Sequence, residues 1–245
     1  MDRGFVPNKR LLLHVATANV NTLRPKYDND VQSERGVAVA ARTQILEVLF
    51  SEAGLDLVGI QEGRAKVDGS RSGVCYDMVI AGATPMGSYG NQLWIHSHLR
   101  YKLQATIVHS PTLLQVDMVI NDAYEVAAFV GHAPHEHDSA DNKCAFWTLL
   151  LAVTLRSRDI KPNAHVVLLI DANARVGSVV SPQLGPCASQ AENNNGECFR
   201  IYLEATALSA GNTFHDAGDT WVITFGMSHR IDYIVSSVDP AREVD

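Results

Sequence analysis

The run His165-Val-Val-Leu-Leu-Ile-Asp-Ala-Asn173 sets the architecture of this chain. Residues 165–170 are almost continuously apolar, which is typical of a central strand buried on both faces of a sheet. Asp171 follows the run directly, and Asn173 comes two residues later. Because residues two apart in an extended chain point to the same side, these two polar side chains can share one pocket. The run therefore predicts a central strand that ends in a polar site.

Short apolar runs on either side of this strand predict a chain rich in β-structure. Val116, Met118 and Ile120 alternate with polar residues, which indicates a strand with one solvated face and favours antiparallel hairpins. Helices are predicted over residues 35–52, 141–157 and 197–206, and a long polar loop over 177–195. Further strands are predicted over residues 11–18, 55–61, 78–81, 92–96, 104–109, 113–121, 124–131, 221–225 and 230–236. This mixture predicts an α/β (α+β) fold, with two mostly antiparallel sheets packed face to face and flanked by helices.

Length and composition favour one globular domain. The chain has 245 residues, 46% hydrophobic and 19% charged, with no internal repeat and no interdomain linker. We see no signal peptide and no apolar run of the roughly 20 residues that a membrane helix needs. The four cysteines lack CxxC spacing, so we expect reduced thiols in an intracellular protein, nuclear or cytoplasmic. The net charge of −7 excludes a global basic surface, so nucleic-acid binding would need a local site with metal ions.

Oxygen-bearing side chains stand where the predicted strands end. Asn19 follows the first strand, Glu62 the second, and Asp171 with Asn173 the central one. Asp232 lies inside the last strand, where a carboxylate is costly unless it has a partner. A cluster of hard oxygen ligands at strand ends is what a Mg²⁺ or Mn²⁺ site requires.

Each of these residues also has a structural explanation. Turns and caps commonly use Asn and Asp, and a strand end can simply leave Glu62 in solvent. Asp232 can form a salt bridge with Arg230 or Arg200. Position alone therefore leaves both explanations open for each residue.

A dense run of histidines and acids offers a rival site, His132-Ala-Pro-His135-Glu136-His137-Asp138. His135 and His137 have a spacing found in zinc hydrolases, but the Asp-His pair that usually follows is missing here. A solvated loop is the interpretation that we favour. The sequence also lacks a Walker-A segment, a GxGxxG after a strand and a GxSxG, which excludes nucleotide-dependent and serine-hydrolase enzymes.

Short motifs follow one another along residues 11–236. They are Thr17-Ala-Asn19-Val-Asn21-Thr-Leu-Arg24, Gly59-Ile-Gln61-Glu62, Gly131-His132-Ala-Pro134, Ile170-Asp171-Ala-Asn173 and His229-Arg230-Ile231-Asp232-Tyr233. In this order they resemble the motifs of the endonuclease/exonuclease/phosphatase superfamily, which includes DNase-I-like nucleases, abasic-site endonucleases and LINE-type retrotransposon endonuclease domains. The retrotransposon branch is the most similar, through Asn194-Asn195-Gly196, Asn212-Thr213-Phe214 and Thr220-Trp221. The resemblance implies a four-layer sandwich.

The resemblance also implies a role for each matching residue. Glu62 matches the metal-binding glutamate, and Asn19 matches the asparagine that supports the metal and phosphate site. With Asp171 they make up the implied Mg²⁺ or Mn²⁺ site. Asp171 and Asn173 match the pair that orients the attacking water and contacts the scissile phosphate. His132 stands at a position that contacts the phosphate or assists as an acid.

Asp232 matches the aspartate that orients the family's general-base histidine. That histidine lies in a Ser-Asp-His motif on one further strand, and residues 234–245 do not contain it. His229 lies three residues before Asp232 and cannot simply replace it. We therefore expect residues 1–245 to be one domain without its last strand and catalytic histidine, weakly active or inactive. We also expect the strand at 230–236 to leave its outer edge unpaired.

These observations predict metal-dependent phosphodiester hydrolysis, specifically DNA nicking by a retroelement-type endonuclease domain with nucleic acid as its partner. One alternative is a phosphatase or phosphodiesterase that acts on a small or lipid phosphate. Another is a catalytically inactive copy that only binds nucleic acid or a protein partner. Arg24, Arg64 and Arg175 lie just beyond motif strands and are candidates for phosphate contacts, unless they are simply solvated. Trp221 is a candidate for stacking on a base, with core packing as the alternative.

Overall fold

The computed structural model describes residues 11–21, 23, 42–222 and 228–237 of the chain. Its helices are α1 (Arg42–Glu52), α2 (Ala140–Ile160) and α3 (Asn194–Thr206), with a short 3-10 helix η1 (Gly211–Thr213). Its strands are β1 (Val15–Asn19), β2 (Leu57–Gln61), β3 (Gly69–Ser72), β4 (Tyr76–Ile80), β5 (Gln92–His96), β6 (Tyr101–Ser110), β7 (Leu113–Ile120), β8 (Tyr124–His132), β9 (His165–Asp171), β10 (Ser209–Ala210), β11 (Trp221–Val222), β12 (Ser228–His229) and β13 (Asp232–Ser236).

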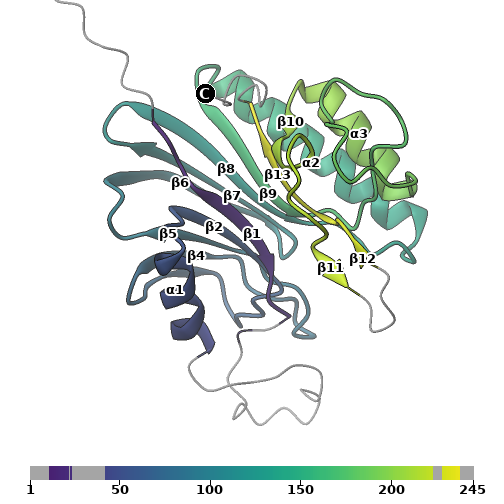
Figure 1. Cartoon of the computed structure of the whole chain (residues 1–245). Coiled ribbons are helices and arrows are strands. Elements are labelled where there is room, and N and C mark those ends of the chain that lie inside the picture. Colours follow the sequence, from purple (N-terminus) through teal and green to yellow (C-terminus); the bar gives the residue numbers. More distant parts are fainter. Residues whose placement is uncertain (1–10, 22, 24–41, 223–227, 238–245) are drawn as a thin grey trace, which may run out of the picture.

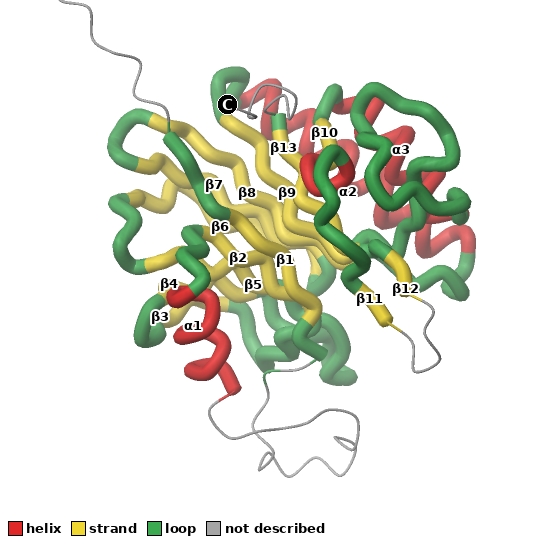
Figure 2. The backbone as a smooth tube through the Cα atoms, in the orientation of Figure 1, coloured by secondary structure: helices red, strands yellow, loops and turns green. Residues whose placement is uncertain are grey.

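The strands form two mixed sheets and one small hairpin (Figure 1, Figure 2). The five-stranded sheet has the order β1-β2-β5-β4-β3, and the six-stranded sheet has the order β10-β13-β9-β8-β7-β6. The pairs β1–β2 and β8–β9 are parallel, and the other pairs of the two sheets are antiparallel. The predicted sandwich of mostly antiparallel sheets is therefore confirmed.

Three hydrophobic cores define four layers. One core lies between α1 and the five-stranded sheet, where Phe50 of the helix packs near Trp94. A second core lies between the two sheets and includes Leu93 and Leu169. The third lies between the six-stranded sheet and the helices α2 and α3, with Phe199 of α3 among its members. The order helix, sheet, sheet, helices is that of a DNase-I-like sandwich.

The two sheets approach each other closely at Gly59 in β2. A Cβ atom added at this position would lie 2.5 Å from the Cβ atom of Leu169 in β9, on the facing sheet. Both strands are almost completely buried, so neither can move toward solvent to make room. The apolar strand around Gly59 therefore needs a residue without a side chain at this contact.

We expect Gly59→Ala to lower the free energy of unfolding by about 1–3 kcal/mol, because overpacking forces the facing sheets apart. Chemical denaturation of the purified chain measures this change. Gly211→Ala is the matched control, since its added Cβ atom would meet only the Ile234 carbonyl oxygen at an ordinary 3.7 Å. Equal stability of the two variants would show that the sheets tolerate a methyl group at Gly59.

The predicted central strand at residues 165–170 is confirmed, since β9 lies between β8 and β13. The first strand begins later than predicted, at Val15, and includes Asn19. The predicted helix at 35–52 is seen from Arg42 onward, and its residues 35–41 lie outside the described residues, as do residues 223–225 of the strand predicted at 221–225. Strands β3, β10 and β12 were not predicted, because they are too short or too polar to show a hydrophobic pattern.

The expectation of an unpaired outer edge on the strand at 230–236 is wrong. This edge of β13 pairs with the two-residue strand β10, through Ser209 and Ala210. Beyond β10, the side chain of Asn212 forms hydrogen bonds with the backbone of β13, as a neighbouring strand would. Its Nδ2 atom donates to the Asp232 carbonyl oxygen at 3.0 Å, and its Oδ1 atom accepts from the Ile234 amide at 3.2 Å. Both backbone groups are thereby satisfied without a longer strand.

Composition predicted reduced cysteines and no membrane-spanning helix. All four cysteines are free thiols, in agreement with the absence of paired spacing. Among the described helices, none is sufficiently long and apolar to span a lipid bilayer.

Candidate active site

The candidate residues meet where strands of both sheets end. Asn19 is the last residue of β1, and Glu62 directly follows the parallel neighbour β2. His132 and Asp171 are register partners at the ends of β8 and β9, which are also parallel. Asp232 begins β13 directly opposite Asp171. Strand register thus places residues that are far apart in the sequence at one edge of the sandwich.

Asn19 joins the two sheets at this edge. Its Nδ2 atom donates to Glu62 Oε1 at 3.2 Å and to Asp171 Oδ2 at 3.0 Å. Its Oδ1 atom accepts from the Asn21 amide at 3.0 Å. The side chain therefore presents its N–H groups, rather than its oxygen, to the two carboxylates.

Glu62 lies in the turn that ends β2, with a left-handed backbone at φ 55°. One carboxylate oxygen receives the Asn19 bond, and the other accepts from the Arg64 guanidinium at 2.5 Å. Burial by itself would raise the pKa of Glu62, but the hydrogen bonds from Arg64 and Asn19 outweigh it and hold the pKa below its ordinary value. Glu62 is therefore an anion at neutral pH, half-buried beside a cation.

Asp171 is buried, with 3% of its surface exposed, and both of its oxygens are hydrogen-bonded. Oδ2 accepts from Asn19, and Oδ1 accepts from the backbone amide of Asn173 at 3.2 Å. The chain is not extended at Asn173, as the two-residue spacing had implied, but turns into the left-handed region at φ 47°. Asn173 still lies beside Asp171, and its Nδ2 atom donates to the Ala133 carbonyl oxygen at 2.9 Å.

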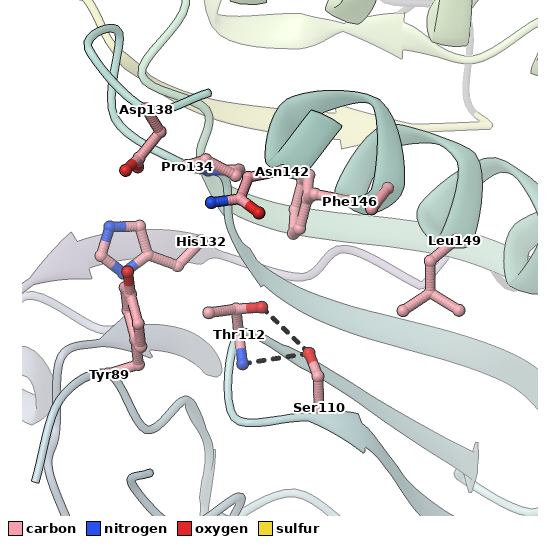
Figure 3. A pocket seen from close by; sticks show the side chains of 10 residues that line it. Tyr89, Ser110, Thr112, His132, Pro134, Asp138, Asn142, Phe146 and Leu149 are labelled. Carbon is pink, nitrogen blue, oxygen red and sulfur yellow. Dashed lines mark hydrogen bonds between the residues drawn. The ribbon is translucent and has the colours of Figure 1, made fainter. Parts of the chain in front are cut away.

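His132 forms the wall of the site on the β8 side. It is 7% exposed, and its Nε2 atom lies 3.8 Å from Asp171 Oδ2. Its Nδ1 atom is buried and has no hydrogen-bond partner among the described residues. The ring of Tyr89 packs against the imidazole edge-on, with ring centroids 5.5 Å apart (Figure 3).

Asp232 is held next to a second carboxylate without a compensating cation in the described part of the chain. Burial raises the pKa of Asp232 to about 7, the charge of Asp171 adds to the rise, and a hydrogen bond with the Thr220 side chain opposes it. The salt bridge considered from the sequence does not form. Arg230 donates to the carbonyl oxygens of Gly218 and Cys187, and Arg200 pairs with Glu192. Asp232 Oδ1 is buried and unpaired among the described residues.

The four substrate-binding candidates differ in their placement. Arg64 lies in the site, where it forms a salt bridge with Glu62. Arg175 forms a salt bridge with Glu136 at 2.7 Å. Trp221 is 41% exposed on the β11–β12 hairpin and stacks on His229, with ring planes 9° apart. This exposure excludes the core-packing alternative for Trp221. Arg24 lies outside the described residues.

The rival zinc site is not formed in the part of the chain that the structure describes. His135 and His137 are exposed in the loop before α2, and the His137 amide donates to His135 Nδ1 within a turn. No group of three or more His, Cys, Asp or Glu side chains is arranged there to enclose a metal ion. The solvated-loop interpretation holds for His135 and His137, whereas His132, at the start of the same run, is buried at the end of β8.

Two residues of the site were not singled out by the sequence. Tyr89 lies in the loop between β4 and β5 and reaches His132 only through the tertiary fold. The side-chain oxygen of Thr220 accepts a hydrogen bond from the Asp232 backbone amide at 3.1 Å, and this bond fixes the start of β13. Thr220 had appeared only beside Trp221 in a quoted motif, and no pattern marked Tyr89.

The chain belongs to the endonuclease/exonuclease/phosphatase family, whose sequence pattern matches residues 16–244. The members of this family are nucleases and phosphatases, so this chain falls in a family of hydrolases that act on phosphate esters. No curated protein sequence matches the chain.

Solved structures with the same fold cover most of this chain. An abasic-site endonuclease from Leishmania major superposes with a TM-score of 0.67 at 14% identity, covering 95% of this chain and 81% of that one. A 3′-5′ exonuclease from Neisseria meningitidis gives 0.60 at 17% identity, covering 91% and 86%. The endonuclease domain of TRAS1, a telomere-specific non-LTR retrotransposon, gives 0.56 at 16% identity, covering 91% and 83%. Identities this low establish the fold alone.

Proposed function

We propose that this chain hydrolyses phosphodiester bonds in nucleic acid with the help of Mg²⁺ or Mn²⁺, as a retroelement-type endonuclease domain that nicks DNA. The observation that carries the proposal is the bridge made by Asn19 between Glu62 and Asp171, next to the buried His132. Carboxylates and donors are here held together at the ends of strands from both sheets. The TRAS1 endonuclease domain is one of the structures with this fold.

The donor set fits a hard divalent cation. Mg²⁺ is usually held by one or two carboxylates and completes its shell with water and substrate phosphate, so it does not need a cage of protein ligands. Glu62 and Asp171 supply two such carboxylates around Asn19. Asn19 would become an oxygen ligand only after its amide turns over, and as placed it positions the two carboxylates. A metal bound here would withdraw negative charge from the phosphoryl oxygens and the leaving group.

The other side chains would act on the phosphate and on water. Asp171 would align a water molecule and accept its proton, and His132 would donate to a non-bridging oxygen. Asn173, anchored to Ala133, would hold the phosphate from the other side of Asp171. Arg64 and Arg175 would contact neighbouring phosphates, which a chain of net charge −7 cannot attract by its overall charge.

A second candidate function is nucleic-acid binding without turnover. It is favoured by Asp232, whose Oδ1 atom has no partner in the described residues and whose pKa is raised by burial beside Asp171. In the family resemblance this carboxylate orients a histidine, and no histidine among the described residues is hydrogen-bonded to its Oδ1 atom. Filter-binding and plasmid-nicking measurements on the same preparation separate the two functions. Tight binding without nicking supports the second candidate and contradicts the first.

The metal proposal gives a direct prediction for Glu62→Gln. We expect this variant to bind Mn²⁺ at least about tenfold more weakly than wild type, because an amide oxygen replaces a charged hard ligand. Isothermal titration calorimetry of Mn²⁺ measures the change. Glu52→Gln, an exposed glutamate at the end of α1, is the matched control and should bind as wild type does. Equal Mn²⁺ affinity of wild type and Glu62→Gln would remove Glu62 from the site.

A further inference from the structure

A pocket of about 280 Å³ opens beside the candidate site, and its lining includes His132, whose Nε2 atom lies 3.8 Å from Asp171 Oδ2. Figure 3 shows His132 and Tyr89 along one side and Phe146 and Leu149 of α2 along the other. The volume lies just below the roughly 300–1,000 Å³ of pockets for drug-sized ligands. It therefore suits a single ring system rather than a larger molecule.

The walls of the pocket combine an apolar floor with a polar rim. Phe146, Leu149 and Ala145, all from the first turns of α2, present carbon atoms to the cavity. Polar groups come from Asn142, from the Asp138 carboxylate, which can accept from an amino group of a base, and from the Ser110–Thr112 hydroxyl pair, whose oxygens lie 2.9 Å apart. A flat ring that has hydrogen-bond donors and acceptors only along its edge is complementary to an apolar floor with polar groups at the rim. A sugar or polyol would instead bury hydroxyl groups against Phe146 and Leu149 without partners.

His132 connects this pocket to the proposed chemistry. Its Nε2 atom faces Asp171 at 3.8 Å, while its buried Nδ1 atom has no partner among the described residues. The imidazole ring of His132 therefore belongs both to the wall of the pocket and to the proposed catalytic site. A group in the pocket is thus the immediate neighbour of a phosphate held by His132.

Tyr89 is fixed in place before any ligand arrives. Its backbone lies in the left-handed region at φ 65°, and its carbonyl oxygen accepts from the Arg64 amide at 3.1 Å. Non-glycine residues adopt this conformation only where the surroundings impose it. The ring against His132 is therefore a preformed aromatic wall, next to the arginine that pairs with Glu62.

We infer that this pocket takes one unpaired nucleobase, from the nucleotide next to the phosphate that is cleaved. The inference rests on the proposed function and adds to it a preference for strands that are single-stranded or contain an unpaired nucleotide, while a fully paired duplex is still bound and cleaved without this contact. A base inside a duplex is stacked on both faces and cannot enter the pocket. The aromatic wall and the apolar floor accept the ring faces of any base, and the rim pairs with its edge.

The test compares two substitutions on one helix, both measured by binding in EDTA. Ala145→Phe adds a ring at a residue that lines the pocket, and Ala152→Phe places the same side chain on α2 outside the pocket; both alanines are exposed, so neither ring has to enter the core. The probes are DNA and RNA oligonucleotides with one 2-aminopurine, either single-stranded or fully paired. We expect wild type and Ala152→Phe to prefer the single strand by about 5–100-fold, the effect of stacking one base. Ala145→Phe should lose this preference and the 2-aminopurine fluorescence change, while its duplex affinity and melting temperature stay unchanged.

Failure of this inference differs from failure of the proposed function. An unchanged single-strand preference in Ala145→Phe, or no preference in wild type, overturns the pocket assignment even if the chain cleaves nucleic acid. Pocket-dependent binding in a chain that never cleaves supports the assignment and overturns only the proposed hydrolysis. Comparing the affinities of the DNA and RNA oligonucleotides shows whether the protein prefers deoxyribose or ribose, which the pocket does not determine because it contacts only the base.

Discussion

Cleavage of DNA by the Asp171→Asn variant is expected to fall by about 10²–10⁴-fold, the usual contribution of a positioned acid or base. The substitution removes the only group in the described site that we propose to accept a proton from water. It also removes one acceptor of the Asn19 bridge, since an amide offers a single oxygen where the carboxylate offers two. The measurement is the rate of plasmid nicking at saturating protein, which reports turnover rather than binding.

Asp159→Asn is the matched control, because Asp159 is an exposed aspartate near the end of α2 and is not one of the candidate site residues. It should nick at the wild-type rate. Binding of single-stranded DNA by Asp171→Asn, measured in EDTA, should stay within a few-fold of wild type, because we propose that Asp171 acts on the metal ion and on water. A variant that binds and nicks as wild type does would show that Asp171 only supports the fold.

The Asp232→Asn variant is expected to be more stable than wild type near neutral pH. Burial and the neighbouring Asp171 raise the pKa of Asp232 from 3.8 to about 7 in the folded chain. A carboxyl group with a raised pKa favours folding while it is protonated, and this contribution is lost as the pH rises through the folded value. The advantage of Asp232→Asn should therefore be small near pH 4, grow up to about pH 7 and stay constant above it, reaching about 2–4 kcal/mol.

Thermal melts at several pH values measure this difference. A gain of this size should raise the melting temperature by about 5–15 °C above pH 7, by the usual scaling for a chain of this length. Asp122→Asn is the control, because this aspartate is exposed in the β7–β8 turn and pairs with the exposed Arg100. A difference between wild type and Asp232→Asn that does not change with pH would contradict the raised pKa.

Much of the fold was predictable because burial leaves a periodic trace in the sequence. The strand at residues 165–170 is apolar on both faces since it lies in the middle of the six-stranded sheet. The alternation in β7 correctly predicted a strand, but the solvated face predicted for it is wrong, because Gln115 and Asp117 are buried and hydrogen-bonded to each other. Strand β10 could not be predicted, because a strand of two residues is too short to show an alternation of polar and apolar side chains. The Asn212 side chain that covers the edge of β13 is likewise invisible to pattern, since any turn asparagine looks the same.

The site was predictable as a set of residues but not as a geometry. Asn19, Glu62 and Asp171 stand at strand ends in the sequence, and the structure places them in contact. The direction of the Asn19 amide depends on the two carboxylates around it, and the left-handed backbone of Asn173 depends on the turn after β9. Tyr89 reaches His132 only because the β4–β5 loop folds over the end of the other sheet. Such contacts between distant segments have no local signature.

Plasmid nicking in Mg²⁺ and in EDTA, with wild type and Glu62→Gln side by side, tests the central claim most directly. We expect wild type to convert supercoiled DNA to the nicked circle in Mg²⁺ and not at all in EDTA. Glu62→Gln should be inactive at the same Mg²⁺ concentration. Nicking by wild type in EDTA, equal nicking by Glu62→Gln, or no nicking by wild type in either buffer would contradict the claim that this site hydrolyses nucleic acid with a metal ion.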